Sequence, residues 1–126
     1  MKKGVGEKER KLSELVIEIS NVIPRGKVAY YGQIADILWG KYGREVSAQV
    51  VGWALFGLPP EVVENTGWHR IIKKTGEIAT MKLGFKGQKQ IELLELEGVN
   101  CSGDIVDMIL FGISTGELVG LLGGNK

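Results

Sequence analysis

The chain contains one histidine, which lies in the stretch NTGWHRII between Trp68 and Arg70. Histidine can act as a general base near neutral pH, because its ordinary pKa is about 6.5, but it needs a nucleophile beside it. The single cysteine, Cys101, lies far downstream in the sequence, and one His with one Cys cannot build a zinc site of several such ligands. We therefore expect no metal and no cofactor, and His69 is either a buried structural residue or part of a larger arrangement.

The composition is that of a globular protein, with 126 residues of which 44% are apolar and 25% charged. This length suits one domain, so residues 1–126 are treated as one. A net charge of +1 gives no overall attraction to nucleic acid, so a nucleic-acid partner must be argued from local patches. The lone cysteine and the polar N-terminal residues, which lack the apolar stretch of a secretory signal, predict an intracellular protein, cytoplasmic or nucleoid-associated.

Apolar residues at three-and-four spacing predict a helix that begins near Leu12 and ends before Pro24 and Gly26. A short extended segment at 27–30 and a second helix at about 31–38 follow. Ser47 is an N-cap for a third helix at 48–56. Two short helices joined by a glycine-containing turn are typical of a helix-turn-helix, although many small helical domains contain such a pair.

Beyond the third helix the pattern is mixed. Residues 70–80 predict two strands around the Thr75-Gly76 turn, a small wing, and residues 88–96 predict a helix stopped by Gly98. Residues 105–122 are rich in apolar side chains but contain two acidic residues and three glycines, which favours a packed tail over a membrane span. The expected fold is mainly α with a small β wing, a winged-helix-like helix-turn-helix domain.

Motifs in four places follow one another in order: IPRGKVAYYGQIA at 23–35, SAQVVGWAL at 47–55, GWHRIIKKTGEIA at 67–79 and LLELEGV at 93–99. The first resembles the IPxGxVxTYGxIA opening of the DNA-binding domain of O6-alkylguanine-DNA alkyltransferases. The second is similar to that family's recognition helix, the third to its PCHRVV segment and the fourth to its closing LLxxEGV. The resemblance covers about residues 11–103 and leaves the tail, 104–126, without an assignment.

The chain departs from this pattern at position 68, where the alkyltransferases have their nucleophilic cysteine and this chain has Trp68. An indole cannot accept an alkyl group as a thiolate does. The chain therefore resembles the alkyltransferase-like proteins, and the SGD at 102–104 is similar to the SG of their tryptophan-bearing members. The resemblance implies a protein that is not an enzyme and that retains His69 and Glu97 as scaffold behind the pocket. The residues it assigns to the lesion-binding pocket are Tyr31, Trp68, His69 and Arg70.

By the same resemblance the protein binds O6-alkylguanine in double-stranded DNA through the minor groove and flips the damaged nucleotide out of the helix. Tyr31 would crowd the 3′ phosphate, and Gln49 stands at the position of the family's arginine finger. Gly67 replaces the usual proline before position 68, which we expect to loosen the backbone. The predicted DNA contacts are Lys27, Tyr31, Ser47, Ala48, Gln49 and Gly52. Further phosphate contacts are expected among Arg44, Lys73, Lys74, Lys82, Lys86 and Lys89.

Two other functions stay open at this level. The chain could be an active alkyltransferase that uses a displaced acceptor, Cys101. It could also be a DNA-independent interaction module whose apolar tail docks a partner or a second copy. On the favoured interpretation the protein is a monomer, has no membrane partner, and passes the marked lesion to nucleotide excision repair proteins.

Overall fold

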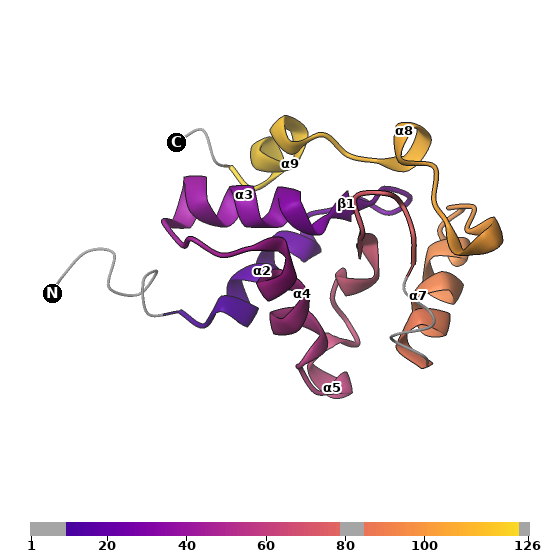
Figure 1. Cartoon of the computed structure of the whole chain (residues 1–126), viewed down its shortest axis with the longest axis horizontal. Coiled ribbons are helices and arrows are strands. Elements are labelled where there is room, and N and C mark those ends of the chain that lie inside the picture. The colour runs from indigo at the N-terminus through magenta and orange to yellow at the C-terminus, as the bar shows by residue number, and fades with distance from the viewer. Residues whose placement is uncertain (1–9, 79–84, 124–126) are drawn as a thin grey trace, which may run out of the picture.

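Short helices make up most of the fold, and two strands of two residues each form a small sheet (Figure 1). The structure is a computed structural model that describes residues 10–78 and 85–123. Residues 79–80 of the predicted wing and Lys82 lie outside these ranges. In chain order the elements are α2 (Leu12–Asn21), β1 (Ala29–Tyr30), α3 (Tyr31–Tyr42), α4 (Ala48–Phe56), α5 (Pro60–Val63), η1 (Trp68–Arg70), β2 (Ile71–Ile72), α7 (Phe85–Leu96), η2 (Ser102–Asp104), α8 (Met108–Phe111) and α9 (Thr115–Leu121).

The main core lies where α2, α3 and α4 pack against one another. The apolar positions of each helix recur at three-and-four spacing, so they share one face and turn it inward. The buried side chains at the centre of this core are Leu15 and Ile19 of α2, Ile34 and Leu38 of α3, and Val51 and Leu55 of α4. The predicted fold class, mainly α with a small β element, is confirmed.

α3 and α4 form the predicted helix-turn-helix, and each end of the turn has a local cause. α3 ends at Gly43, which has φ +68°, and the Arg44 N–H turns back to the Leu38 carbonyl. α4 begins where the Ser47 side chain accepts a hydrogen bond of 3.2 Å from the Val50 N–H. The prediction of α4 is confirmed, whereas α3 continues for one turn beyond the predicted end at residue 38.

The small sheet differs from the predicted wing. Ile71 and Ile72 of β2 pair in parallel with Ala29 and Tyr30 of β1, and within the described residues they do not pair with Glu77 or Ile78 in a hairpin. The predicted turn is present, since the Gly76 N–H donates to the Lys73 carbonyl at 2.8 Å. Residues 76–78, however, bond to the tail at residues 104–106. The hairpin prediction was wrong because it considered only partners close in sequence, and two distant segments take the available edges.

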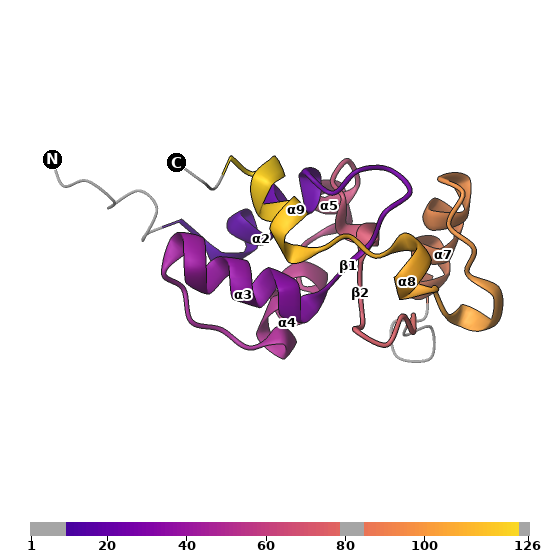
Figure 2. The same ribbon diagram turned by 90° about the horizontal axis from the view of Figure 1, so that it is seen from above.

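The tail packs along the rest of the molecule, as predicted. The Val28 N–H donates to the Phe111 carbonyl and the Ile113 N–H to the Val28 carbonyl, at 2.9 and 2.8 Å, so the tail extends the sheet beside β1. The buried Gln33 side chain donates to the Ile113 carbonyl at 2.7 Å. α9 then lies against α3, with Leu118 fully buried (Figures 1 and 2). Other apolar tail residues stay exposed: Ile105, Ile109, Leu110 and Leu121. None of the described helices has the length and apolar character needed to cross a membrane.

The segment before η1 is held tightly against the end of α2. The Gly67 N–H donates to the Asn21 side-chain oxygen at 3.0 Å. A Cβ at Gly67 would lie 2.2 Å from the Ser20 carbonyl oxygen, so the two backbones approach more closely than any other residue would allow. A proline would lose the N–H as well. Gly67 therefore anchors η1 rather than loosening it, contrary to the expectation from sequence.

This contact predicts that Gly67→Ala lowers the free energy of unfolding by about 1–3 kcal/mol, because the added Cβ must push two backbones apart. Urea titration at neutral pH measures the change. Gly40→Ala is the control, since a Cβ there meets nothing within 4 Å on the exposed side of α3. That variant should be more stable by about 0.4–1 kcal/mol. Equal stability of the two variants would contradict the close approach at Gly67.

Candidate functional site

A buried carboxylate, Glu97, joins three segments that are distant in sequence. Its side chain is 3% exposed and lies just beyond the end of α7. Arg70 donates to it from Nε at 3.0 and 3.2 Å and from Nη2 at 2.7 Å, and the Gly26 N–H donates at 2.9 Å. His69 Nε2 lies 2.7 Å from Oε2. These contacts connect the turn before β1, η1 and the end of α7 at one point.

These donors decide the charge of Glu97. Burial by itself raises the pKa of a carboxyl group, but the hydrogen bonds from Arg70, His69 and Gly26 outweigh it and lower the pKa of Glu97 to about 2. The pKa of His69 is lowered, because burial of its ring disfavours the imidazolium more than Glu97 favours it. At neutral pH the group therefore consists of an ionised Glu97, an ionised Arg70 and a neutral His69.

The neutral imidazole has one proton, and the carboxylate determines where it lies. Nε2 faces Glu97 Oε2 and donates to it, which leaves Nδ1 as the acceptor nitrogen. Among the described residues, Nδ1 has no hydrogen-bond partner although it is buried.

The backbone carbonyls of His69 and Ile71 both accept from the buried Gln90 side chain of α7, at 3.2 and 3.0 Å. η1 is thus fixed to α7 by both side-chain and backbone contacts.

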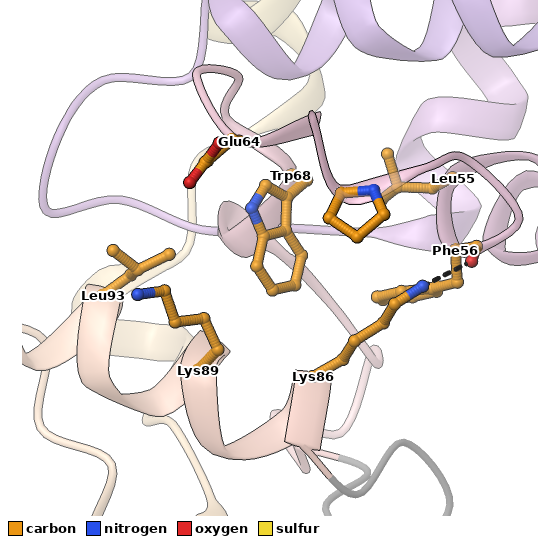
Figure 3. Close-up of a pocket in the computed structure, with 8 residues that line it drawn as sticks. Leu55, Phe56, Glu64, Trp68, Lys86, Lys89 and Leu93 are labelled. Carbon is orange, nitrogen blue, oxygen red and sulfur yellow. Dashed lines mark hydrogen bonds between the residues drawn. The ribbon is translucent and has the colours of Figure 1, made fainter. Parts of the chain in front are cut away.

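Trp68 points the other way, into a cavity of about 360 Å³ between α4 and α7 (Figure 3). Its indole projects into the space between Lys89 and Leu93 on one side and Leu55 and Phe56 on the other. The walls are mostly apolar, and Lys86 Nζ is held at 2.6 Å by the Phe56 carbonyl. The lining residues are Leu55, Phe56, Pro60, Glu64, Trp68, Lys86, Lys89 and Leu93. His69 and Arg70, both predicted pocket residues, lie behind Trp68 and do not line this cavity.

Phe56 connects the cavity to Tyr31. The ring of Phe56 meets those of Trp68 and Tyr31 edge-on, with centroid distances of 6.1 and 6.4 Å. Such edge-to-face contacts fix the rings relative to one another. Tyr31 begins α3 and is half-buried, and burial raises the pKa of its hydroxyl, which stays protonated. Three of the rings at this site therefore form one continuous aromatic row from η1 to α3.

A second hollow, of about 370 Å³, lies on the other side of Tyr31 at the start of α3. Tyr31 and Ala48 line it together with Lys73 and Lys74, which follow β2. The Lys74 ammonium lies 5.9 Å from the centroid of the Tyr30 ring. The pairing of β1 with β2 is what brings these lysines beside the helix-turn-helix. Two of the predicted phosphate contacts thus lie next to predicted DNA contacts on α3 and α4.

The remaining predicted DNA contacts have different settings. Gln49 is exposed on α4, and the Ser47 hydroxyl is occupied as the helix cap. A Cβ at Gly52 would lie 3.7 Å from the Tyr31 ring, so Tyr31 packs over this position. Lys27 belongs to the turn before β1 and lines neither cavity. The Arg44 guanidinium donates to the Arg10 carbonyl at 2.8 Å and is thereby held toward the start of α2.

Cys101 is not part of this site. It is 3% exposed in a second apolar cluster with residues of α7 and the tail, whereas Trp68 belongs to the main core. Burial and the nearby carboxylates of Glu95 and Asp104 raise the pKa of its thiol to about 11. A thiol of this kind is protonated and poorly nucleophilic at neutral pH. Within the described residues, no three or more His, Cys, Asp or Glu side chains come together as a metal site.

Sequence reasoning missed three residues that shape the site. Phe56 was assigned only to a helix, although it follows Gly52 by four residues and so lies on the same face. Gln90 was assigned only to the predicted helix at 88–96, whereas its side chain is buried against η1. Gly26 was assigned only as a helix stop, whereas its N–H also donates to Glu97.

The chain is similar to known proteins over most of its length. Residues 11–99 match the family model described as "6-O-methylguanine DNA methyltransferase, DNA binding domain". Alkyltransferase-like protein 1 of Schizosaccharomyces pombe is 39% identical over 77 residues, which are 61% of this chain and 66% of that protein. The DNA base-flipping protein of Escherichia coli is 34% identical over 97 residues, 77% of this chain and 69% of that protein. The matched segments thus span about two thirds of the length of these relatives.

The fold is similar to solved structures of the S. pombe protein. In the crystal structure of Atl1 with damaged DNA that contains O6-carboxymethylguanine, the TM-score is 0.66 at 30% identity. The match covers 82% of this chain and 94% of that one. A second structure of the S. pombe protein with DNA gives a TM-score of 0.64 at 31% identity, covering 81% and 94% of the two chains. Fold and sequence therefore indicate the same family.

The Glu97 group predicts that the protein loses stability in acid. The folded-state pKa values of Glu97 and His69 both lie below their unfolded values, so the unfolded chain binds more protons as pH falls. Stability should begin to fall below pH about 6.5, as His69 is protonated in the unfolded chain. It should fall further between pH about 4.5 and 2, where the contribution of Glu97, about 3 kcal/mol at neutral pH, is lost. Urea titrations between pH 7 and pH 3 measure this slope.

Glu97→Gln is the variant that tests the cause. It should lower the free energy of unfolding at pH 7 by about 3–5 kcal/mol, because Arg70 stays buried without its counter-charge. It should also flatten the dependence below pH 4.5. Glu95→Gln, which changes an exposed carboxyl group two residues away, is the control and should follow the wild-type curve. An unchanged acid slope in Glu97→Gln contradicts the assignment.

Proposed function

The chain belongs to the family of the DNA-binding domain of 6-O-methylguanine DNA methyltransferase, and from this premise we propose that it binds O6-alkylguanine in duplex DNA without removing the alkyl group. The observation that carries the proposal is the cavity between α4 and α7. One of its lining residues is an indole, Trp68, which by motif resemblance stands where the family has its acceptor cysteine. We propose that this cavity accepts the flipped base, and none of its lining residues has a sulfur atom that could accept an alkyl group.

The chemistry of the site fits binding rather than transfer. Transfer needs a thiolate that attacks the alkyl carbon and a base that takes the thiol proton. None of the residues lining the cavity is a cysteine, and Cys101 lies in another cluster with a raised pKa. The Nε2–H of His69 donates a hydrogen bond to Glu97, so this nitrogen cannot act as a base. We therefore assign His69 and Glu97 to the support of η1, which holds Trp68 at the edge of the cavity.

The aromatic lining gives the flipped base something to bind. A base that leaves the duplex loses stacking worth a few kcal/mol, and this loss must be offset in the pocket. Stacking on an aromatic side chain is worth about 1–3 kcal/mol per base. Trp68 and Phe56 provide apolar area inside the cavity, and Tyr31 lies at the end of the same row. The relative from E. coli is named a DNA base-flipping protein, which supports the same mechanism.

Tyr31 and the second hollow suit the phosphate backbone. The hollow combines the start of α3 with the ammonium groups of Lys73 and Lys74, which outnumber the one carboxylate in its lining, Asp36. A phosphate placed there would lie against Tyr31, which would press on the nucleotide and rotate it toward the cavity. The net charge of +1 is no obstacle, because these cations are gathered at one place. The relative from S. pombe has been solved with damaged DNA, in agreement with this assignment.

The steps after lesion recognition are a further proposal from the family resemblance. The protein would act as a monomer that marks the lesion, and nucleotide excision repair proteins would take over from the complex. No cofactor is needed for this role, because binding and base flipping use only contacts of the protein with DNA.

Fluorescence anisotropy of matched duplexes that carry guanine or O6-methylguanine tests the proposal. At fixed salt, the wild-type protein should bind the lesion duplex at least about tenfold more tightly, equivalent to about 1.4 kcal/mol. Tyr31→Ala should remove most of this difference. Tyr31→Phe keeps the packing on Phe56 and Gly52 and should retain part of it. Equal affinity of wild type for both duplexes refutes the proposed function.

Mass spectrometry of the same mixtures separates binding from transfer. The protein mass should stay unchanged after incubation with the lesion duplex, since the cavity contains no acceptor. A gain of one methyl group that disappears in Cys101→Ser would instead establish the alternative, an active alkyltransferase.

Gln49 provides the second test. By motif resemblance it stands where the family has an arginine that enters the helix, and its amide lacks the planar cation that is attracted into the minor groove. Gln49→Arg should bind the lesion duplex about tenfold more tightly than wild type. Gln88→Arg, which adds the same charge at an exposed position of α7, is the control for charge alone. A gain no larger than that of the control contradicts the assignment of Gln49.

A further inference from the structure

The outward face of α4 carries an exposed tryptophan. α4 turns Val51 and Leu55 into the core, and the side chains opposite them belong to Gln49 and Trp53, which are one helical turn apart. Trp53 is 65% exposed, so its indole is free of the core that the rest of the helix packs into. The sequence left its direction open, and the structure places it outward.

This face is continuous with the two parts of the proposed site. Gly52, the neighbour of Trp53 on the helix, lies under the Tyr31 ring. Phe56, one turn further along, lines the cavity and contacts Trp68. Side chains on a helix lean toward its N-terminus, so the indole of Trp53 extends over the turn that carries Gln49. Trp53 therefore lies between Gln49, the residue predicted to enter the minor groove, and the cavity. On the proposed function this surface faces the DNA.

We propose that Trp53 is a DNA-inserting residue, which fills the space left in the duplex when the damaged nucleotide is flipped. The proposal rests on the proposed function and adds to it a group that shares the task with Gln49. The amide of Gln49 can hydrogen-bond the unpaired cytosine but covers little of its face. The indole provides a large planar apolar surface beside it, which is the kind of side chain that wedges between base steps.

The exposure of Trp53 favours DNA as the occupant of this face over a protein partner. The hollow that Ala48 and Tyr31 line beside this face carries two ammonium groups, Lys73 and Lys74, against one carboxylate, Asp36. A polyanion complements this combination of ammonium groups and a planar ring. Stacked bases also provide a flat surface of the size of the indole, and stacking on it tolerates any sequence.

Anisotropy with the O6-methylguanine duplex tests this inference in three variants. Trp53→Ala should weaken binding about tenfold, and Trp53→Phe, which keeps a smaller ring, should weaken it less. Trp39→Ala is the matched control, because Trp39 is 60% exposed on α3 and lies outside the α4 face. It should leave the affinity unchanged. Thermal unfolding should be the same in all three, since neither indole belongs to the core.

Intrinsic fluorescence gives a readout that a structural role would not change. Stacking on a base should quench the indole of Trp53, so the lesion duplex should quench wild type and Trp39→Phe more strongly than Trp53→Phe. Trp53 is not an inserting residue if wild type prefers the lesion duplex and Trp53→Ala retains both its affinity and its preference. Failure of wild type to prefer the lesion is a different result, which overturns the proposed function and this inference with it.

Discussion

The ionised carboxylate of Glu97 is the constraint on which the rest of the site depends. A charge that is 3% exposed is tolerable only when donors surround it, and here they come from Arg70, His69 and the Gly26 N–H. These donors belong to segments that no local interaction would bring together. Any rearrangement of one segment would leave a buried charge unpaired. The group therefore sets the position of η1 relative to β1 and α7, and through η1 the direction of Trp68.

The same arrangement limits what the histidine can do. A general base must have a lone pair directed at the group it deprotonates, and the Nε2 side of His69 is occupied by Glu97. Nδ1 is buried, and among the described residues nothing contacts it by a hydrogen bond. The residue next to His69 on the cavity side is Trp68, whose indole is not a nucleophile. The contacts of His69 account for a structural role, in which it helps to neutralise Glu97 and to hold η1 beside the cavity.

Local patterns were sufficient for part of this structure. The spacing of apolar residues and the caps predicted α2, α4 and the turn between α3 and α4, because those features depend on neighbouring residues. The resemblance predicted that His69 and Glu97 lie together, and they are joined by a hydrogen bond. The strand pairing was missed because the partners of Ile71–Ile72 and of residues 76–78 are distant in sequence. The burial of Gln90 and the exposure of Trp53 depend on how helices are oriented, which weak periodicity in α7 and α4 did not reveal.

On the proposed function, in which Trp68 takes the place of an acceptor cysteine, the cavity must hold the lesion by contacts alone. An enzyme that transfers the alkyl group is driven forward by an irreversible reaction, so it can tolerate a short-lived flipped state. A protein that only binds the lesion must hold the flipped nucleotide at equilibrium, and every part of the unstacking cost must be offset by contacts. On the proposed function, the row from Trp68 through Phe56 to Tyr31 and the exposed Trp53 on α4 are the aromatic side chains available for such contacts. Large rings with few rotatable bonds lose little conformational entropy on binding, so aromatic side chains suit a protein that binds the damaged nucleotide without removing the alkyl group.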